Sequence, residues 1–121
     1  MAPRILCVDD EPNIRVLFEA ELTEAGYEVD TAPSGTEALK KIEAQAPDLM
    51  LLDIRMEDMT GLELVQKIRP KHPNLPVIMV TAVRGLRDDI SIEADDRVVG
   101  YITKPVDLDE LRAKVKQALA S

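Results

Sequence analysis

Carboxylates directly follow two apolar segments of the sequence, and their types and spacing suit a cation site. A cluster of acids follows the apolar run at 5–8, and one more acid follows the apolar run at 49–52. These residues are Asp9, Asp10, Glu11 and Asp53. Adjacent like charges repel, and a carboxylate that leaves water is destabilised unless a positive group joins it. The pattern therefore predicts a cation or a basic side chain among these acids.

Polar residues that follow two later apolar runs extend this chemistry. Thr81 follows the run at 77–80, and Thr103 and Lys104 follow the run at 98–102. Clustered oxygen ligands favour a hard cation that keeps part of its water, which describes Mg²⁺ better than Zn²⁺. A carboxylate beside such a cation can be a nucleophile in phosphoryl transfer, a reaction that depends mainly on positioning and charge neutralisation. Lys104 and Thr81 would then contact the phosphoryl oxygens.

Each of these residues has a simpler explanation when it is taken alone. Asp and Thr often follow strands as turn or helix-capping residues, and Lys104 before Pro105 also fits an ordinary exposed loop. The chemical interpretation depends on all of these residues following predicted strands. That combination is much less expected by chance than any one of them alone.

Two alternating periodicities describe the elements that must hold these side chains. Strands are predicted at 4–8, 28–32, 49–52, 77–80 and 98–102, each followed by an amphipathic helix. Continuous apolar strands separated by helices indicate an α/β fold with a parallel sheet covered on both faces. Right-handed crossovers favour a doubly wound, flavodoxin-like, five-stranded sheet in the order 2-1-3-4-5. In that order the carboxyl ends of strands one and three are neighbours, so their acids converge on one pocket.

Length and composition predict one domain over 1–121, with no effector domain in this chain. Hydrophobic residues make up 45% of the 121 residues and aromatic residues only 2%, which predicts an aliphatic core. The net charge of -8 argues against direct binding to nucleic acid. A single cysteine, Cys7, excludes an internal disulfide. No apolar run is long enough to cross a bilayer, so we expect a cytoplasmic protein without membrane contact.

Four motifs make the sequence resemble the response-regulator receiver domain of two-component signalling. They are VDDE at 8–11, LLDIRMEDMTGLEL at 51–64, VTA at 80–82 and YITKP at 101–105. VDD alone is a weak signal, but the four motifs in this order and spacing are specific. The resemblance covers essentially the whole chain.

The resemblance implies a phosphate acceptor and a metal site. Asp53 would be the acceptor, and Asp9 or Asp10, or both, would bind Mg²⁺ or Mn²⁺ together with Asp53 and the backbone carbonyl of Arg55. Arg55 and Val83 would flank the path of the hydrolytic water. A long side chain and an apolar one there should hinder water, so we expect a phosphate lifetime longer than in fast chemotaxis-type regulators.

The resemblance also implies the parts of a switch. Thr81 and Lys104 would contact the phosphoryl group, and Tyr101 would change rotamer on activation. The Lys104–Pro105 peptide is typically cis in the family, which would direct the lysine inward.

The sequence departs from the family pattern in three places. Glu57 and Asp58 stand where the family often has Pro-Gly or Pro-Asn, and Thr60 stands before Gly61 where it often has Asp. Arg97 and Val98 stand where the family often has Gly-Ala. The two acids near the pocket could either strengthen the attraction of a metal or repel an anionic phosphodonor. The segment 85–99 has the weakest pattern, and its helix, expected at 86–94, could be short or displaced.

These observations predict a phosphorylation-dependent signalling switch that modifies only itself. It would accept a phosphoryl group from a sensor histidine kinase or a phosphotransfer protein. Its output face, and a homodimer interface, would combine the helix at 86–94, the strand at 98–102 and the last helix.

Three alternative functions compete with the switch. A degenerate receiver would be a phosphate-independent interaction module, and the intact acids, threonine and lysine weigh against it. A dehalogenase-type phosphohydrolase needs a D-x-D motif after its first strand, whereas Asp9 and Asp10 are adjacent. A flavodoxin-like electron carrier needs a Ser/Thr/Gly-rich phosphate loop after its first strand, and none follows here.

Overall fold

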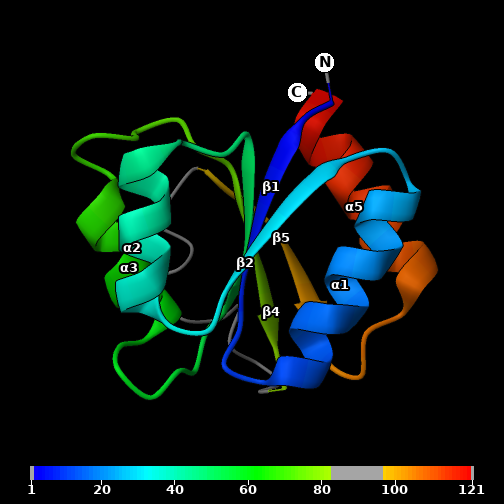
Figure 1. The fold of residues 1–121 in the computed structure, drawn as a ribbon, viewed down its shortest axis with the longest axis horizontal. Helices are drawn as coiled ribbons and strands as arrows, with labels where there is room; N and C mark the ends of the chain where they lie inside the picture. The colour runs from blue at the N-terminus through cyan, green and yellow to red at the C-terminus, as the bar shows by residue number, and fades with distance from the viewer. Residues whose placement is uncertain (1, 83–96, 121) are drawn as a thin grey trace.

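A computed structural model describes residues 2–82 and 97–120 and shows a five-stranded parallel sheet between two layers of helices (Figure 1). The strand order is β2-β1-β3-β4-β5, which confirms the predicted topology. α2 and α3 cover one face of the sheet, and α1 and α5 cover the other. The elements are β1 (Arg4–Val8), α1 (Pro12–Glu24), β2 (Glu28–Ala32), α2 (Gly35–Ala44), β3 (Leu49–Asp53), α3 (Gly61–Ile68), β4 (Val77–Thr81), β5 (Val98–Thr103) and α5 (Leu108–Ala120). The helix expected at 86–94 lies outside the described residues.

Alternate side chains of each strand enter two separate apolar layers, because successive residues of a strand point to opposite faces. In β1, Leu6 and Val8 join the layer with α2 and α3, whereas Ile5 and Cys7 join the layer with α1 and α5. Among the described residues, Phe18 is the one aromatic side chain in the buried core, so the predicted aliphatic core is confirmed. The sheet is therefore packed against helices on both of its faces.

Among the helices that the structure describes, a polar side chain caps the start of α2, α3 and α5, but not that of α1. Ser34, Thr60 and Asp107 begin α2, α3 and α5, each by accepting a backbone N–H from the first turn. At the start of α1, Pro12 occupies the first turn, where its missing N–H has no cost. Glu11 precedes it, and its side chain makes no capping hydrogen bond. That carboxylate is therefore available for another contact.

The start of α3 packs directly against the end of β3. A Cβ atom added at Gly61 would lie 2.7 Å from the carbonyl oxygen of Asp53 and 3.0 Å from Cα of Ile54. The N–H of Gly61 donates to the carbonyl of Ile54 at 2.7 Å. Glycine is therefore required here by the close approach of two backbone segments, and it fixes the backbone behind Asp53.

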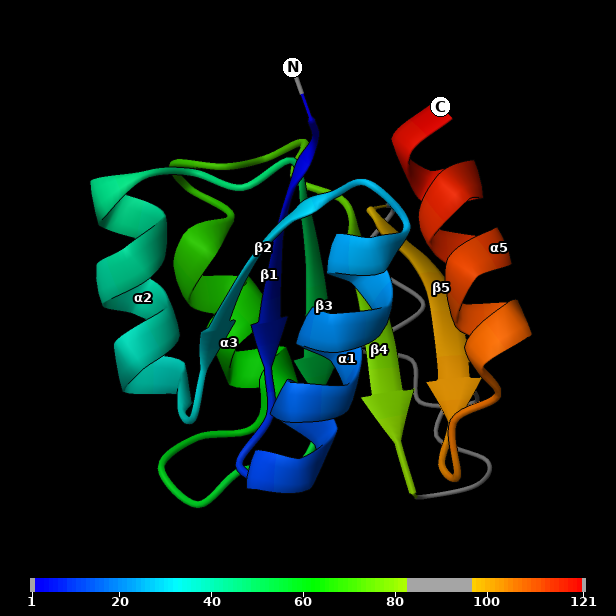
Figure 2. The same cartoon turned by 45° about the vertical axis from the view of Figure 1, so that its right-hand side comes forward.

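All five strands run in the same direction, so their carboxyl ends share one edge of the sheet (Figure 2). Both termini lie at the opposite edge in this view. No helix within residues 2–82 and 97–120 has the length and apolar character needed to span a membrane.

Candidate functional site

The carboxyl edge of the sheet brings the predicted site residues together. Asp53 ends β3, Thr81 ends β4, and Asp9 directly follows β1. Within the described part of the chain these are the buried polar residues, with exposed fractions of 6%, 4% and 2%. β1 and β3 are adjacent, with Val8 opposite Leu52, so Asp9 and Asp53 leave neighbouring strands at the same level. Topology alone therefore places two carboxylates side by side.

Local hydrogen bonds hold the acidic turn after β1. Asp9 Oδ1 accepts the N–H of Glu11 at 2.9 Å, and Arg15 Nη1 donates to the carbonyl oxygen of Asp9 at 2.7 Å. Oxygen atoms of Asp9, Asp10, Glu11 and Asp53 all lie within 4.8 Å of one another. Asp9 and Asp53 are buried, whereas Asp10 and Glu11 are exposed. The cluster thus combines two carboxylates removed from water with two at its rim.

Lys104 supplies the positive charge that the sequence required among these acids. Its Nζ lies 2.8 Å from Glu11 Oε1, 3.1 Å from Asp9 Oδ2 and 3.3 Å from Asp53 Oδ2. The backbone N–H of Lys104 donates to the carbonyl of Thr81 at 2.8 Å, which ties the lysine to the end of β4. The Lys104–Pro105 peptide is cis, as the resemblance implied.

Burial and neighbouring charge shift the pKa values of the two central groups. Burial, and then the nearby Asp9 carboxylate, raise the pKa of Asp53, while Lys104 partly opposes this shift. Burial alone would lower the pKa of Lys104, but its hydrogen bond to Glu11 and the carboxylates of Asp9 and Asp53 raise it overall. Lys104 is therefore held in its charged form, and a further cation would favour the charged form of Asp53.

The charge balance of the donor set fits a metal ion. Asp9 Oδ2 is shielded from water and forms an ion pair with the Lys104 ammonium at 3.1 Å. The buried carboxylates of Asp9 and Asp53 share this one ammonium, so a further cation would compensate the remaining negative charge. Carboxylate oxygens are the ligands that Mg²⁺ prefers, and the exposed Asp10 leaves room for water in its shell. The residues present therefore fit Mg²⁺.

Other predicted residues take different places around the pocket. The N–H of Arg55 donates to Asp53 Oδ1 at 3.2 Å, so its backbone lies beside the proposed acceptor. Tyr101 is half-buried in β5, opposite Met79, and packs against the layer beneath α2 and α3. Lys114 Nζ donates to the carbonyl oxygen of Tyr101 at 2.5 Å. Val83 lies outside the described residues.

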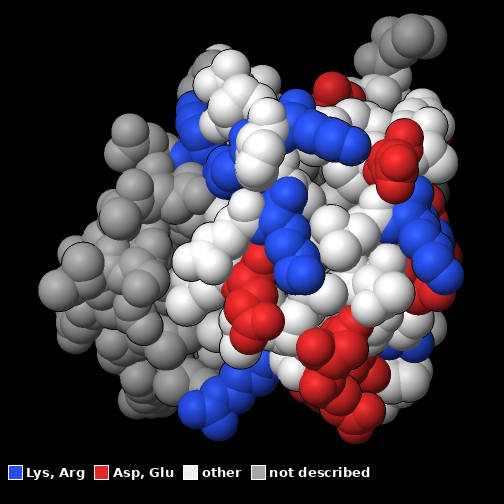
Figure 3. All heavy atoms as spheres, turned by 90° about the vertical axis from the view of Figure 1, so that its left-hand side faces the viewer, with Lys and Arg blue, Asp and Glu red and all other residues white. Residues whose placement is uncertain are grey.

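Asp58 has a structural role that the sequence did not reveal. Its carboxylate accepts the N–H of Gly35 at 3.1 Å, the N–H of Thr36 at 2.9 Å and the Thr36 hydroxyl at 2.7 Å. These hydrogen bonds, first of all those from Thr36, lower the pKa of Asp58 to about 2. The carboxylate thus binds the start of α2. Acidic side chains gather toward the carboxyl edge of the face formed by α2 and α3, where the loop after β3 also carries the exposed Glu57 (Figure 3).

Glu11 is the site residue that the sequence interpretation left without a role. It is the third adjacent acid, but the predicted metal site consists of Asp9, Asp10, Asp53 and the backbone carbonyl of Arg55 and does not include it. The structure places its carboxylate on Lys104, which is distant in the sequence. The signal that could have pointed to such a contact is a glutamate directly before a proline at a helix start, where glutamate is not a preferred capping residue.

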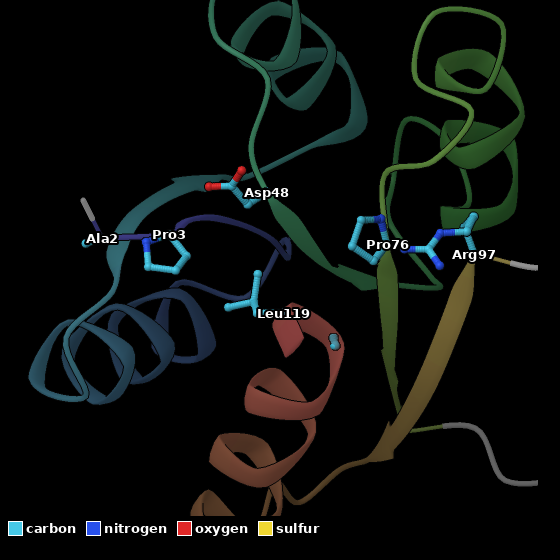
Figure 4. A pocket seen from close by; sticks show the side chains of 7 residues that line it. Ala2, Pro3, Asp48, Pro76, Arg97 and Leu119 are labelled. Atoms are coloured by element: carbon cyan, nitrogen blue, oxygen red, sulfur yellow. The ribbon is translucent and has the colours of Figure 1, made fainter. Parts of the chain in front are cut away.

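A hollow at the opposite edge of the sheet offers no comparable chemistry (Figure 4). It is lined by Ala2, Pro3, Asp48, Pro76, Arg97, Ala118 and Leu119. Asp48 Oδ2 accepts the N–H of Arg4 at 2.8 Å, and Arg97 Nε donates to the carbonyl of Asn74 at 3.1 Å. Both charged groups of this hollow thus already stabilise the chain itself.

Fold and site together define a doubly wound α/β domain with an acidic, lysine-containing pocket at its carboxyl edge. The sequence profile of the response regulator receiver domain matches residues 5–116. The chain therefore belongs to the response regulator receiver family.

Two curated relatives are transcriptional regulators. The DNA-binding transcriptional regulator NtrC of Klebsiella pneumoniae is 41% identical over 114 residues, which cover 93% of this chain and 24% of NtrC. The transcriptional regulatory protein GlrR of Escherichia coli K12 is 37% identical over 115 residues, which cover 95% of this chain and 26% of GlrR. This chain spans about a quarter of the length of these regulators.

A similar solved structure is the response regulator TrrA of Thermotoga maritima in complex with Mg²⁺ and beryllium fluoride. It is 48% identical, has a TM-score of 0.87, and the match covers 98% of this chain and 100% of TrrA. TrrA has also been solved in complex with the histidine kinase ThkA, with a TM-score of 0.86 to this chain, and that match covers 98% of this chain and 99% of TrrA.

Replacing Asp53 by Asn should raise the melting temperature of the metal-free protein at neutral pH. Because the pKa of Asp53 is raised on folding, its contribution to stability is full below the ordinary aspartate pKa and is lost as the pH rises through the raised value. The gain from Asp53→Asn should therefore be largest near pH 7 and shrink toward about pH 3. Thermal melts with a chelator test this, with Glu24→Gln as a control that removes one exposed charge at the far end of α1. A pH-independent gain, or a loss at neutral pH, would contradict the account.

Proposed function

We propose that this chain is a phosphorylation-dependent signalling switch that accepts a phosphoryl group on Asp53 from a histidine kinase or a phosphotransfer protein. The observation that carries the proposal is the Lys104 ammonium 3.3 Å from Asp53 Oδ2, beside the buried carboxylate of Asp9. The complexes of TrrA with the kinase ThkA and with Mg²⁺ and beryllium fluoride support it by similarity. The chain would modify its own side chain and no external substrate.

The chain's own groups account for the transfer step. A carboxylate oxygen of Asp53 forms a bond to phosphorus as the bond from phosphorus to the donor breaks, and the donor leaves with that electron pair. Lys104 directs its ammonium at this carboxylate and would neutralise the phosphoryl oxygens. Thr81 ends the neighbouring strand, so its hydroxyl can donate a hydrogen bond to the transferred group. The pocket therefore supplies positioning and charge, which phosphoryl transfer chiefly requires.

Mg²⁺, or Mn²⁺ in its place, completes the proposed site. Carboxylates of Asp9, Asp10 and Asp53 would hold it, together with the backbone carbonyl of Arg55. When bound, the cation supplies positive charge beside the phosphoryl oxygens. The third acid, Glu11, is paired with Lys104 and is not needed for this ligand set.

The proposed output passes from Thr81 to Tyr101. A phosphoryl group on Asp53 would draw the Thr81 hydroxyl toward the pocket, and the half-buried ring of Tyr101 could then turn inward behind β4. An aromatic ring that moves between exposed and buried positions changes the surface by a large apolar area. The face formed by β5 and α5 would then bind a partner or a second copy of the chain.

The proposal places direct DNA binding outside this domain. NtrC is a DNA-binding regulator four times as long as the matched region, whereas this chain carries a net charge of -8. A receiver that answers a histidine kinase would act in the cytoplasm. A phosphate-independent interaction module would not need a lysine held on a buried carboxylate.

Incubation with acetyl phosphate and Mg²⁺ should add one phosphoryl group to the chain. Intact mass should show the adduct in the wild type with Mg²⁺, and much less of it with a chelator. Asp53→Asn should abolish the adduct because the nucleophilic oxygen is replaced by an amide. Undiminished labelling of that variant at another residue would refute the assignment of Asp53, and wild-type labelling unaffected by the chelator would refute the metal requirement.

Beryllium fluoride with Mg²⁺ should shift NMR resonances well beyond the pocket, because it mimics the aspartyl phosphate. Residues of β5 and α5, including Tyr101, should change along with those near Asp53. The same addition to Asp53→Asn is the control and should leave β5 and α5 unchanged. If wild-type shifts stay confined to the pocket, the Tyr101 switch is wrong for this protein.

A further inference from the structure

The contact between Glu11 and Lys104 is not explained by the proposed metal site, which takes its carboxylates from Asp9, Asp10 and Asp53. Glu11 Oε1 lies 2.8 Å from Lys104 Nζ, closer than either Asp9 Oδ2 at 3.1 Å or Asp53 Oδ2 at 3.3 Å. Glu11 stands at the start of α1, yet its side chain makes no capping bond there. The nearest partner of the catalytic lysine is therefore not the proposed phosphate acceptor.

We propose that Glu11 restrains the Lys104 ammonium and competes with the phosphoryl group for it. Glu11 is thus a positioning residue that weakens the hold of the unmodified pocket on an incoming phosphoryl group. The inference rests on the proposed acceptor function of Asp53. It adds that Glu11 lowers the affinity of the pocket for the transferred phosphoryl group.

The position of the Lys104 ammonium depends on the carboxylates around it. The main chain of Lys104 is fixed because its N–H donates to the carbonyl of Thr81. Only the flexible side chain can move, and it carries three N–H donors. The ammonium donates hydrogen bonds to Glu11 and Asp53 and also lies 3.1 Å from Asp9 Oδ2. A phosphoryl group on Asp53 brings new anionic oxygens, which would draw the ammonium away from Glu11.

The contact between Glu11 and Lys104 can break at little cost because the Glu11 side chain is exposed to water. The Lys104 side chain is only 12% exposed, whereas that of Glu11 is 59% exposed. Once the lysine turns to the phosphoryl group, Glu11 can rotate into water and recover its hydration. A buried acid in the same place would instead be left without a partner at a large cost. Glu11 is therefore suited to be a temporary partner.

The main competing explanation is that Glu11 is a direct ligand of Mg²⁺, since its carboxylate belongs to the acidic cluster. The two roles predict opposite effects of Glu11→Gln. Loss of a ligand would weaken Mg²⁺ binding and, with it, the binding of a phosphoryl analogue. If Glu11 instead competes for Lys104, its loss would tighten the binding of the phosphoryl analogue. The affinity for Mg²⁺ would then stay close to that of a control variant that loses one exposed acid elsewhere.

The test measures affinity for beryllium fluoride at saturating Mg²⁺ by calorimetry, and affinity for Mg²⁺ alone. Glu11→Gln should bind beryllium fluoride about two- to fivefold more tightly than the wild type, the range expected for a largely exposed ion pair. The matched control is Glu57→Gln, which removes an exposed acid from the loop after β3. It should change the affinity by less than Glu11→Gln does, and the two variants should bind Mg²⁺ alike.

A double-mutant cycle in metal-free protein tests the contact itself. Melting temperatures of Glu11→Gln, Lys104→Met and the double variant should be non-additive by roughly 1–4 °C, because each single change removes the same ion pair. Additive shifts would overturn the proposal.

Three results of the affinity measurements would also overturn it. These are unchanged or weaker beryllium fluoride binding by Glu11→Gln, an equal gain in Glu57→Gln, and a loss of Mg²⁺ binding confined to Glu11→Gln. A wild type that binds no beryllium fluoride would contradict the proposed function itself, and this inference with it.

Discussion

The organisation of this protein depends on gathering carboxylates around one ammonium at the edge of a parallel sheet. Asp9 and Asp53 leave adjacent strands side by side and are almost fully buried. Two carboxylates in that position oppose folding unless positive charge joins them, and Lys104 supplies part of it. The two buried carboxylates share this one ammonium, so the pocket is suited to a second cation.

An unfavourable pocket of this kind needs a rigid support, and the sheet provides one. β3 and β4 are buried along their whole length, with apolar layers above and below them. Gly61 brings α3 directly against the end of β3, and Asp58 fastens the intervening loop to the start of α2. Asp53 is therefore held by packing on both faces of the sheet. Changes in its charge should move the less buried Tyr101 in β5 rather than the strand that carries it.

Much of this arrangement follows from the sequence because it depends on periodic patterns. Apolar runs alternating with amphipathic helices determine the topology, and the topology determines which strand ends meet, so the convergence of Asp9, Asp53, Thr81 and Lys104 was predictable. The partners of Glu11 and Asp58 were not, since they depend on the rotamers of exposed side chains and on the path of a loop. Glu57 and Asp58 looked equivalent in the sequence, yet only the loop geometry shows that the Asp58 carboxylate binds α2. The helix expected at 86–94 had the weakest amphipathic pattern and lies outside the described residues.

The central claim is that the clustered carboxylates form a cation site, and a calorimetric titration with Mg²⁺ tests it most directly. The wild type should show saturable binding and a rise in melting temperature with added Mg²⁺, since a ligand that binds only the folded state stabilises it. A variant with both Asp9→Asn and Asp10→Asn should lose both effects and melt higher than the wild type without metal, because less like charge is crowded at the edge of the sheet. Wild-type binding strength in that double variant would contradict the account.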